Sequence, residues 1–104
     1  MLSKRKYVTS DKIAYFYFND GYSYLTTTEG KKLVVDYSLD QLSGLLNPKS
    51  FFRISRKVIV HDQCISKIHT WFNSRLKLDL TPNSDFEVLV SRDRVGEFKS
   101  WLDQ

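Results

Sequence analysis

The chain has 104 residues, of which 41% are hydrophobic and 27% charged, and its formal net charge is +4. This length fits one domain of about 100 to 150 residues, so residues 1–104 are expected to form a single domain with its core between residues 7 and 102. The composition excludes wholesale disorder, and no apolar run approaches the roughly 18 residues that a membrane-spanning helix needs.

Two further features concern the cellular compartment. Asp11 and Lys12 stand where a signal peptide would have an uninterrupted apolar region. The single cysteine, Cys64, cannot form an internal disulfide, which fits a reducing compartment and a place in the core. The sequence therefore predicts a cytoplasmic protein without a membrane partner.

The first third of the chain has the pattern of an antiparallel meander. Residues 13–18 are aromatic-rich without a helical period, and residues 22–27 are β-favouring. Between them, Asn19-Asp20-Gly21 is typical of a hairpin turn. A second turn at residues 28–31 precedes a third predicted strand at residues 32–35.

A short helix follows the meander. Ser38 is a good N-cap, and Asn47-Pro48 ends the run. The apolar positions of this segment recur at helical spacing: Leu39, Leu42, Leu45 and Leu46.

From residue 51 the chain returns to β character, but the alternation breaks. In one straight strand, Arg56 would share a face with Phe52, Ile54 and Val58, which would bury a guanidinium group in the core. A bend or bulge at residues 55–57 avoids this cost and moves Arg56 and Lys57 outward to the rim of the sheet.

The last third contains more strands and a final helix. Strands are predicted at residues 64–69, 76–80 and 86–90, with a turn at 82–85. Ser91 is expected to cap the final helix, whose apolar residues are Val95, Phe98 and Leu102, with Trp101 beside them. The whole pattern predicts a mainly β fold with seven or eight strands and two helices.

No pattern of catalytic or metal-binding residues is present. His61 and His69 are eight residues apart and match no common zinc motif, and Cys64 alone cannot build a thiolate site. The four glycines lie outside any phosphate-binding loop pattern. The chain is therefore interpreted as non-enzymatic, with no metal or cofactor.

The basic residues indicate a function more clearly than the candidate catalytic or metal-binding residues do. The segment between Asp40 and Asp62 has no acidic residue and carries four cations: Lys49, Arg53, Arg56 and Lys57. Arg92, with Arg94 close by, falls near the start of the final helix, where the helix dipole disfavours a cation and favours a phosphate. These positions predict contacts with phosphates or guanine edges. The alternative is a solvated basic surface, with Asp93 neutralising the helix end.

Four tyrosines alternate along the first two predicted strands: Tyr15, Tyr17, Tyr22 and Tyr24. Such side chains stack on bases in proteins that bind single-stranded nucleic acid. In strands they more often form core contacts and cross-strand pairs.

Five segments in this order resemble a LytTR domain, the output domain of many bacterial response regulators. They are residues 19–22 (NDGY), 38–42 (SLDQL), 51–60 (FFRISRKVIV), 65–68 (ISKI) and 90–92 (VSR). The resemblance implies an elongated antiparallel fold of three small sheets with two short helices. It also implies that loops, rather than a recognition helix, enter successive major grooves of double-stranded DNA.

Carried over by position, the family's base and phosphate contacts fall on Ser23, Arg56 and Arg92. Lys57, Tyr22 and Arg94 are expected as phosphate neighbours. The chain departs from the family in having Lys57 in place of a small residue, which adds a phosphate contact. It also has His61 in place of Asn, which puts the local loop geometry in doubt.

The resemblance thus predicts sequence-specific binding of double-stranded DNA for transcriptional regulation. Such domains usually follow a phosphate-accepting receiver domain, which this chain is too short to contain and which is expected as an N-terminal partner. The sequence leaves open whether two copies pair on DNA. The alternative function is a protein-interaction module that uses exposed β edges, and the third is binding of single strands through the tyrosines.

Overall fold

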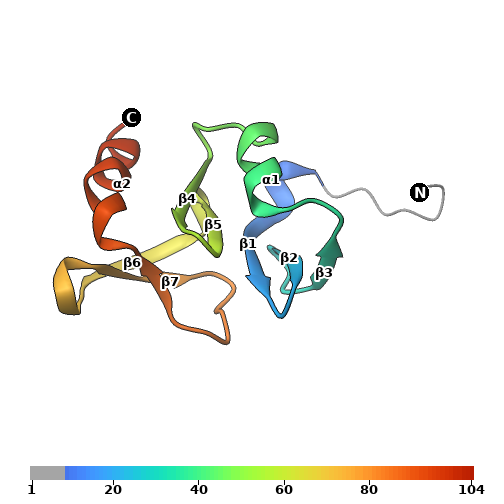
Figure 1. Ribbon diagram of the computed structural model, residues 1–104, viewed down its shortest axis with the longest axis horizontal. Coiled ribbons are helices and arrows are strands. Elements are labelled where there is room, and N and C mark those ends of the chain that lie inside the picture. Colours follow the sequence, from blue (N-terminus) through green and yellow to red (C-terminus); the bar gives the residue numbers. More distant parts are fainter. Residues whose placement is uncertain (1–8) are drawn as a thin grey trace.

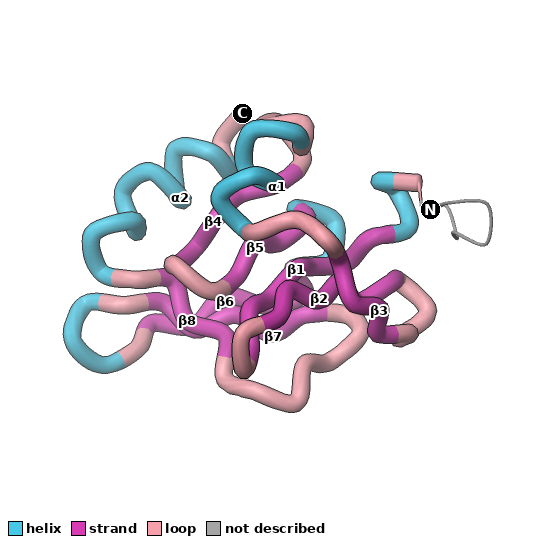
Figure 2. The backbone as a smooth tube through the Cα atoms, turned by 45° about the vertical axis from the view of Figure 1, so that its right-hand side comes forward, coloured by secondary structure: helices cyan, strands magenta, loops and turns pink. Residues whose placement is uncertain are grey.

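Eight strands form two antiparallel sheets in the computed structural model, which describes residues 9–104 (Figure 1). The five-stranded sheet has the order β3-β2-β1-β5-β4 and contains β1 (Ile13–Asn19), β2 (Tyr22–Thr27), β3 (Lys32–Val35), β4 (Phe51–Ser55) and β5 (Val58–His61). The three-stranded sheet has the order β6-β7-β8 and contains β6 (Ile65–Thr70), β7 (Leu76–Leu80) and β8 (Val88–Val90). The α-helices among the described residues are α1 (Leu39–Leu45) and α2 (Val95–Leu102), which lie above the strands in Figure 2.

The fold class is confirmed: the protein is mainly β and elongated, with extents of 45 × 27 × 23 Å. The expected three sheets are wrong, because β5 pairs with both β1 and β4 and joins five strands into one sheet. The predicted N-terminal limit of the core at Tyr7 lies outside the described residues.

The turn between β1 and β2 has the conformation that its residues predict. Asp20 and Gly21 have φ values of 50° and 85°, and Asn19 pairs with Tyr22 across the turn. Two central residues with positive φ match the right-handed twist of the strands that they join, which is why Asp-Gly is favoured there. The meander then continues into β3, as predicted.

The break in alternation at residues 55–57 is confirmed, and it is sharper than a bend. The chain reverses completely, so that Ser55 pairs with Val58 and only Arg56 and Lys57 form the turn. The register also shifts between Arg53 and Ser55, which leaves Ile54 without a partner on β5. The reversal inserts β5 between β1 and β4.

Both faces of the five-stranded sheet are covered. On one face, Phe16, Leu25 and Ile59 pack against Leu39 and Leu42 of α1. On the other face, the three-stranded sheet and α2 close a larger core, whose buried residues include Tyr15, Ile54, Val60, Cys64, Leu78, Val90 and Phe98. Cover on both faces explains why β1 and β5 are apolar without alternation, whereas β7 alternates.

The capping of α1 is confirmed by a reciprocal pair of hydrogen bonds. The Gln41 amide donates to Ser38 Oγ at 3.1 Å, and the Ser38 amide donates to Gln41 Oε1 at 2.8 Å. This capping box satisfies two backbone donors that would otherwise lack partners at the helix start.

The final helix differs from the prediction at both ends. Ser91 makes no side-chain capping bond, and a 3-10 turn, Arg92–Arg94, precedes α2. Phe98 and Trp101 are the buried residues, while Leu102 is 39% exposed. Trp101 faces inward because its Nε1 donates to the Pro48 carbonyl at 2.9 Å, which joins α2 to the segment before β4.

An ion pair joins the two sheets at the rim opposite the helices. Lys32 Nζ of β3 lies 2.7 Å from Asp85 Oδ2 in the loop between β7 and β8. The hydrogen bond from Lys32 lowers the pKa of the Asp85 carboxyl below its ordinary value.

Replacing Phe98 with Ala should destabilise the protein by about 3 to 5 kcal/mol, because a fully buried ring is lost from the larger core. Leu102→Ala on the same helix is the matched control and should cost about 1 kcal/mol or less. Urea unfolding of both variants measures the difference. Equal losses would show that α2 is not packed through Phe98.

The Lys32–Asp85 pair should make stability depend on pH. Because the pKa of Asp85 is lowered in the folded state, the pair stabilises the fold above the unfolded pKa, and this contribution disappears as the pH falls through the folded pKa. In a Lys32→Gln variant, the Asp85 pKa should rise toward the ordinary value of an aspartate, because the hydrogen bond from Lys32 is lost. Carboxyl ¹³C NMR titration measures it, and Asp79, whose pKa is lowered by a hydrogen bond from His69, is the internal control that should not move.

Candidate nucleic-acid interface

The turn between β4 and β5 presents two cations to solvent. Arg56 and Lys57 are exposed, and neither forms an ion pair with any residue between 9 and 104. The backbone beneath them is held firmly, because the Phe18 amide donates to the Lys57 carbonyl at 2.9 Å. Two free cations on a fixed turn are suited to contact an extended anion.

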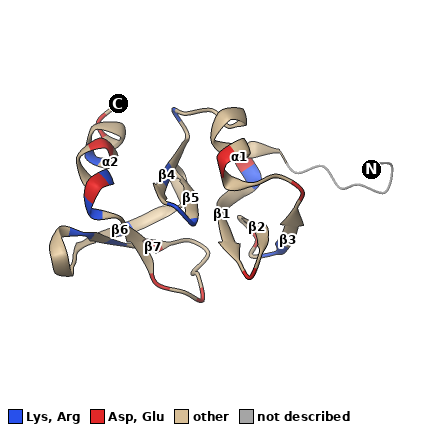
Figure 3. Ribbon diagram, in the orientation of Figure 1, with Lys and Arg blue, Asp and Glu red and all other residues tan. Residues whose placement is uncertain are grey.

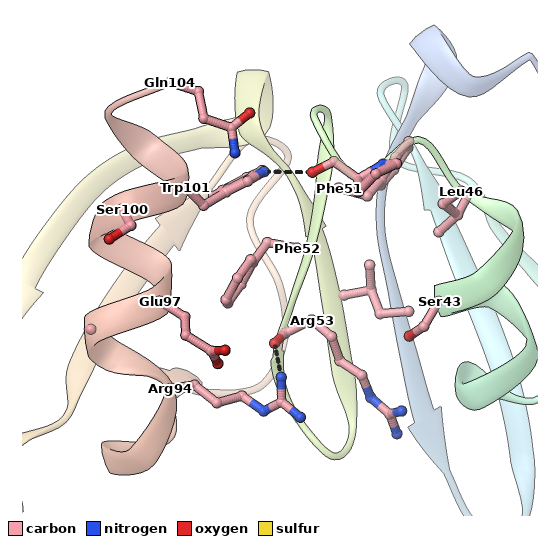
Figure 4. Close-up of a pocket in the computed structure, with 13 residues that line it drawn as sticks. Ser43, Leu46, Phe51, Phe52, Arg53, Arg94, Glu97, Ser100, Trp101 and Gln104 are labelled. Carbon is pink, nitrogen blue, oxygen red and sulfur yellow. Dashed lines mark hydrogen bonds between the residues drawn. The ribbon is translucent and has the colours of Figure 1, made fainter.

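The second pair of predicted residues, Arg92 and Arg94, lies in a 3-10 turn that is bonded to β4. The Ser91 amide and hydroxyl both donate to the Ile54 carbonyl, at 2.9 and 3.2 Å. Arg94 Nη1 donates to the Arg53 carbonyl at 3.3 Å, as the dashed line in Figure 4 shows. These bonds attach the 3-10 turn to the end of β4 and bring Arg92 toward the exposed turn.

The two arginines of the 3-10 turn have different surroundings. Arg92 is exposed, whereas Arg94 is half-buried and bonds to the strand. Arg92 is therefore the one free to reach a ligand, and Arg94 holds the local backbone.

The β1–β2 hairpin carries two further predicted contact residues, Ser23 and Tyr22, which differ in exposure. Ser23 is only 6% exposed, because it lies in a row between Phe18 and Val35. Tyr22, at the start of β2, is 60% exposed. In this conformation the hairpin offers Tyr22 to a ligand and keeps Ser23 covered.

The other three tyrosines of the first two strands pack within the protein. Tyr15 is buried, and the rings of Tyr17 and Tyr24 stack across the two strands with centroids 5.1 Å apart. This is the cross-strand pairing that the sequence favoured over base stacking.

Figure 3 shows how the charges are distributed. Basic residues mark the β4–β5 turn and the start of α2, and acidic residues mark the loop between β7 and β8. Within the basic segment of the sequence, Arg53 is neutralised by an ion pair with Asp40, and Lys49 precedes the opposite end of β4. Two of the three cations of this segment that form no ion pair within residues 9–104, Arg56 and Lys57, therefore lie at the same end of β4.

Two clefts of about 770 Å³ flank the β4–β5 hairpin. One lies between α1 and α2 and contains Arg53 and Arg94 (Figure 4). The other has aromatic walls and contains Lys57 together with Arg75, which sequence reasoning missed. The sequence gives little indication of Arg75. It shows a cation directly before the alternating strand but not which strand end that cation faces.

No metal or nucleophilic centre is assembled within the described part of the chain. Residues 9–104 contain no group of three or more potential metal-ligating side chains. His61 Nδ1 accepts a hydrogen bond from the Gln63 amide at 3.1 Å, and His69 bonds to Asp79. Burial raises the pKa of the Cys64 thiol, which keeps it protonated and a poor nucleophile.

None of the helices between residues 9 and 104 has the length and apolar character to cross a membrane.

Comparison with known proteins agrees with this geometry. The transcriptional regulatory protein YpdB of Escherichia coli K12 is 35% identical over 75 residues, which are 72% of this chain and 30% of YpdB. YpdB of Shigella flexneri matches to the same extent, so the chain spans about a third of the length of these relatives. The solved LytTr DNA-binding domain of a putative methyl-accepting/DNA response regulator from Bacillus cereus superposes with a TM-score of 0.79 at 27% identity, over 89% of this chain and 83% of that one.

The family described as the LytTr DNA-binding domain matches residues 3–103, nearly the whole chain. The exposed basic turn and the arginine beside it therefore lie in a chain that belongs to the LytTR family of DNA-binding domains.

Proposed function

We propose that this domain binds double-stranded DNA sequence-specifically and regulates transcription in the cytoplasm, as the non-enzymatic output domain of a response regulator. The observation behind this proposal is that Arg56 and Lys57 lie in the β4–β5 turn and Arg92 in the 3-10 turn after β8, and that the bonds from Ser91 to Ile54 attach this second turn to β4. Cations carried by two turns that are attached to the same strand can contact neighbouring points on a duplex. The names of the Escherichia coli and Bacillus cereus relatives support this role.

The proposed contacts divide by chemistry. The guanidinium groups of Arg56 and Arg92 can each bind a guanine edge with two hydrogen bonds, so they supply base discrimination. Lys57 is a point charge suited to phosphates, and Tyr22 adds a phosphate contact from the neighbouring hairpin. A receiver domain joined N-terminally would control the domain. The spacing of half-sites in the selected DNA will show whether two copies bind side by side.

Selection of bound duplexes from a random pool at near-physiological salt tests the function directly. We expect enrichment of a defined sequence and preference for duplex over single strands. Enrichment of single strands, with affinity lost in Tyr22→Ala, would instead support stacking on the exposed tyrosine. Binding that stays salt-sensitive but sequence-blind would favour a protein-interaction module.

Arg92→Ala should weaken binding to the selected duplex by about 5- to 100-fold and relax the preference at the base that it contacts. Fluorescence anisotropy with the selected site and its single-base variants measures both effects. If the double variant Arg56→Ala, Arg92→Ala kept wild-type affinity, the assigned site would be wrong.

Lys57→Ala should weaken binding to all duplexes alike, because a phosphate contact carries no sequence information. The slope of log affinity against log salt should become shallower by about 1. Lys49→Ala is the matched control, since it removes the same charge from the other end of β4. A change of slope as large in this control would point to net charge rather than position.

A further inference from the structure

The β4–β5 turn lacks the residues that normally stabilise so tight a reversal. Two-residue hairpin turns favour positive φ and are therefore rich in Asn and Gly. Among residues 9–104 the non-glycine residues with positive φ are Asp20, Asn73 and Ser74, so neither Arg56 nor Lys57 adopts this conformation. The turn must be held by contacts from outside its own two residues.

Arg53 supplies these contacts from within β4. Its Nε donates to the Ser55 carbonyl at 3.3 Å, and its Nη2 donates to the Arg56 carbonyl at 2.6 Å. A planar guanidinium can bridge two successive carbonyls in this way, whereas the single ammonium of a lysine cannot. Because the Arg56 carbonyl is fixed, the direction in which the Arg56 side chain leaves the backbone is fixed as well.

The third nitrogen of Arg53 connects the turn to α1. Nη1 pairs with the carboxylate of Asp40, and this hydrogen bond lowers the pKa of that carboxyl below its ordinary value. Arg53 is largely covered, with 21% of its side chain exposed, and Figure 4 shows its guanidinium on the side of α1. The helix is itself anchored in the core through Leu39 and Leu42.

We propose that Arg53 is a positioning residue that orients Arg56 for DNA, and that Asp40 holds Arg53 in place. This inference rests on the proposed function and deepens it. All three guanidinium nitrogens are bonded to other groups of the protein, so Arg53 acts through the turn rather than as another phosphate contact. The base specificity of the β4–β5 turn would thereby depend on α1, although α1 itself contacts no base.

A double-mutant cycle tests the proposal on the selected duplex. Arg53→Gln should weaken binding about 10-fold in the wild-type background but less than about 2-fold in the Arg56→Ala background, because the two residues act as one unit. Additive losses would overturn the proposal. Arg53→Lys keeps the charge but not the bridge, so it should resemble Arg53→Gln. Near wild-type affinity in Arg53→Lys would mean that Arg53 is a direct phosphate contact.

The role of Asp40 is tested by comparing Asp40→Asn with the same substitution at another exposed aspartate. Asp36→Asn removes an exposed charge just before α1 and reports the general gain from lower repulsion of DNA. Asp40→Asn should bind at least about 3-fold more weakly than Asp36→Asn. Equal affinities for the two variants would contradict the positioning role of Asp40.

A measurement without DNA separates this inference from the proposed function. Backbone ¹⁵N relaxation of the free protein should give order parameters near 0.85 for the Arg56 and Lys57 amides, falling below about 0.6 in Arg53→Gln. Unchanged order parameters would overturn the clamp even if the domain binds DNA. A failure of Arg56→Ala to alter DNA affinity would instead refute the proposed site while the relaxation data still report on Arg53.

Discussion

The carbonyl of Ile54 is the acceptor on which the arrangement of this domain depends. Ile54 is fully buried and has no partner on β5, so its carbonyl would be left unsatisfied in the core. The amide and hydroxyl of Ser91 satisfy it, and Ser91 follows directly after β8. One irregularity in one strand thereby joins the two sheets and sets the place of the 3-10 turn that carries Arg92.

The packing of the core determines which surfaces of the five-stranded sheet remain exposed. Both faces of the five-stranded sheet are consumed by packing, one against α1 and the other against the three-stranded sheet and α2. A ligand as large as a duplex finds no free sheet face there. This agrees with our proposal that the exposed turns at the strand ends of this sheet contact DNA, in a chain of the LytTR DNA-binding family.

The arginines near these turns are not equivalent, although their chemistry is the same. Arg53 and Arg94 bond to backbone carbonyls and stiffen the structure around the site, while Arg56 and Arg92 remain exposed. A rigid backbone beneath an exposed charged side chain lowers the ordering cost of binding. Net charge alone does not distinguish these roles, since each guanidinium contributes the same single positive charge.

Local chemistry in the sequence determined the elements themselves. The Asp20-Gly21 turn, the Ser38 cap, the alternation along β7 and the break at residues 55–57 each depend on residues a few positions apart. The family pattern, carried by short ordered segments, was equally local. The basic residues were therefore found from the sequence.

Tertiary structure decided which of the predicted residues are exposed. Ser23 is covered because Phe18 and Val35 flank it on neighbouring strands, and Leu102 is exposed because Trp101 turns inward to bond the Pro48 carbonyl. The number of sheets depended on the pairing of β5 with β1, whose residues are about forty positions apart in the chain. Periodicity and turn chemistry carry no information on contacts of such sequence separation, so only the folded chain fixes them.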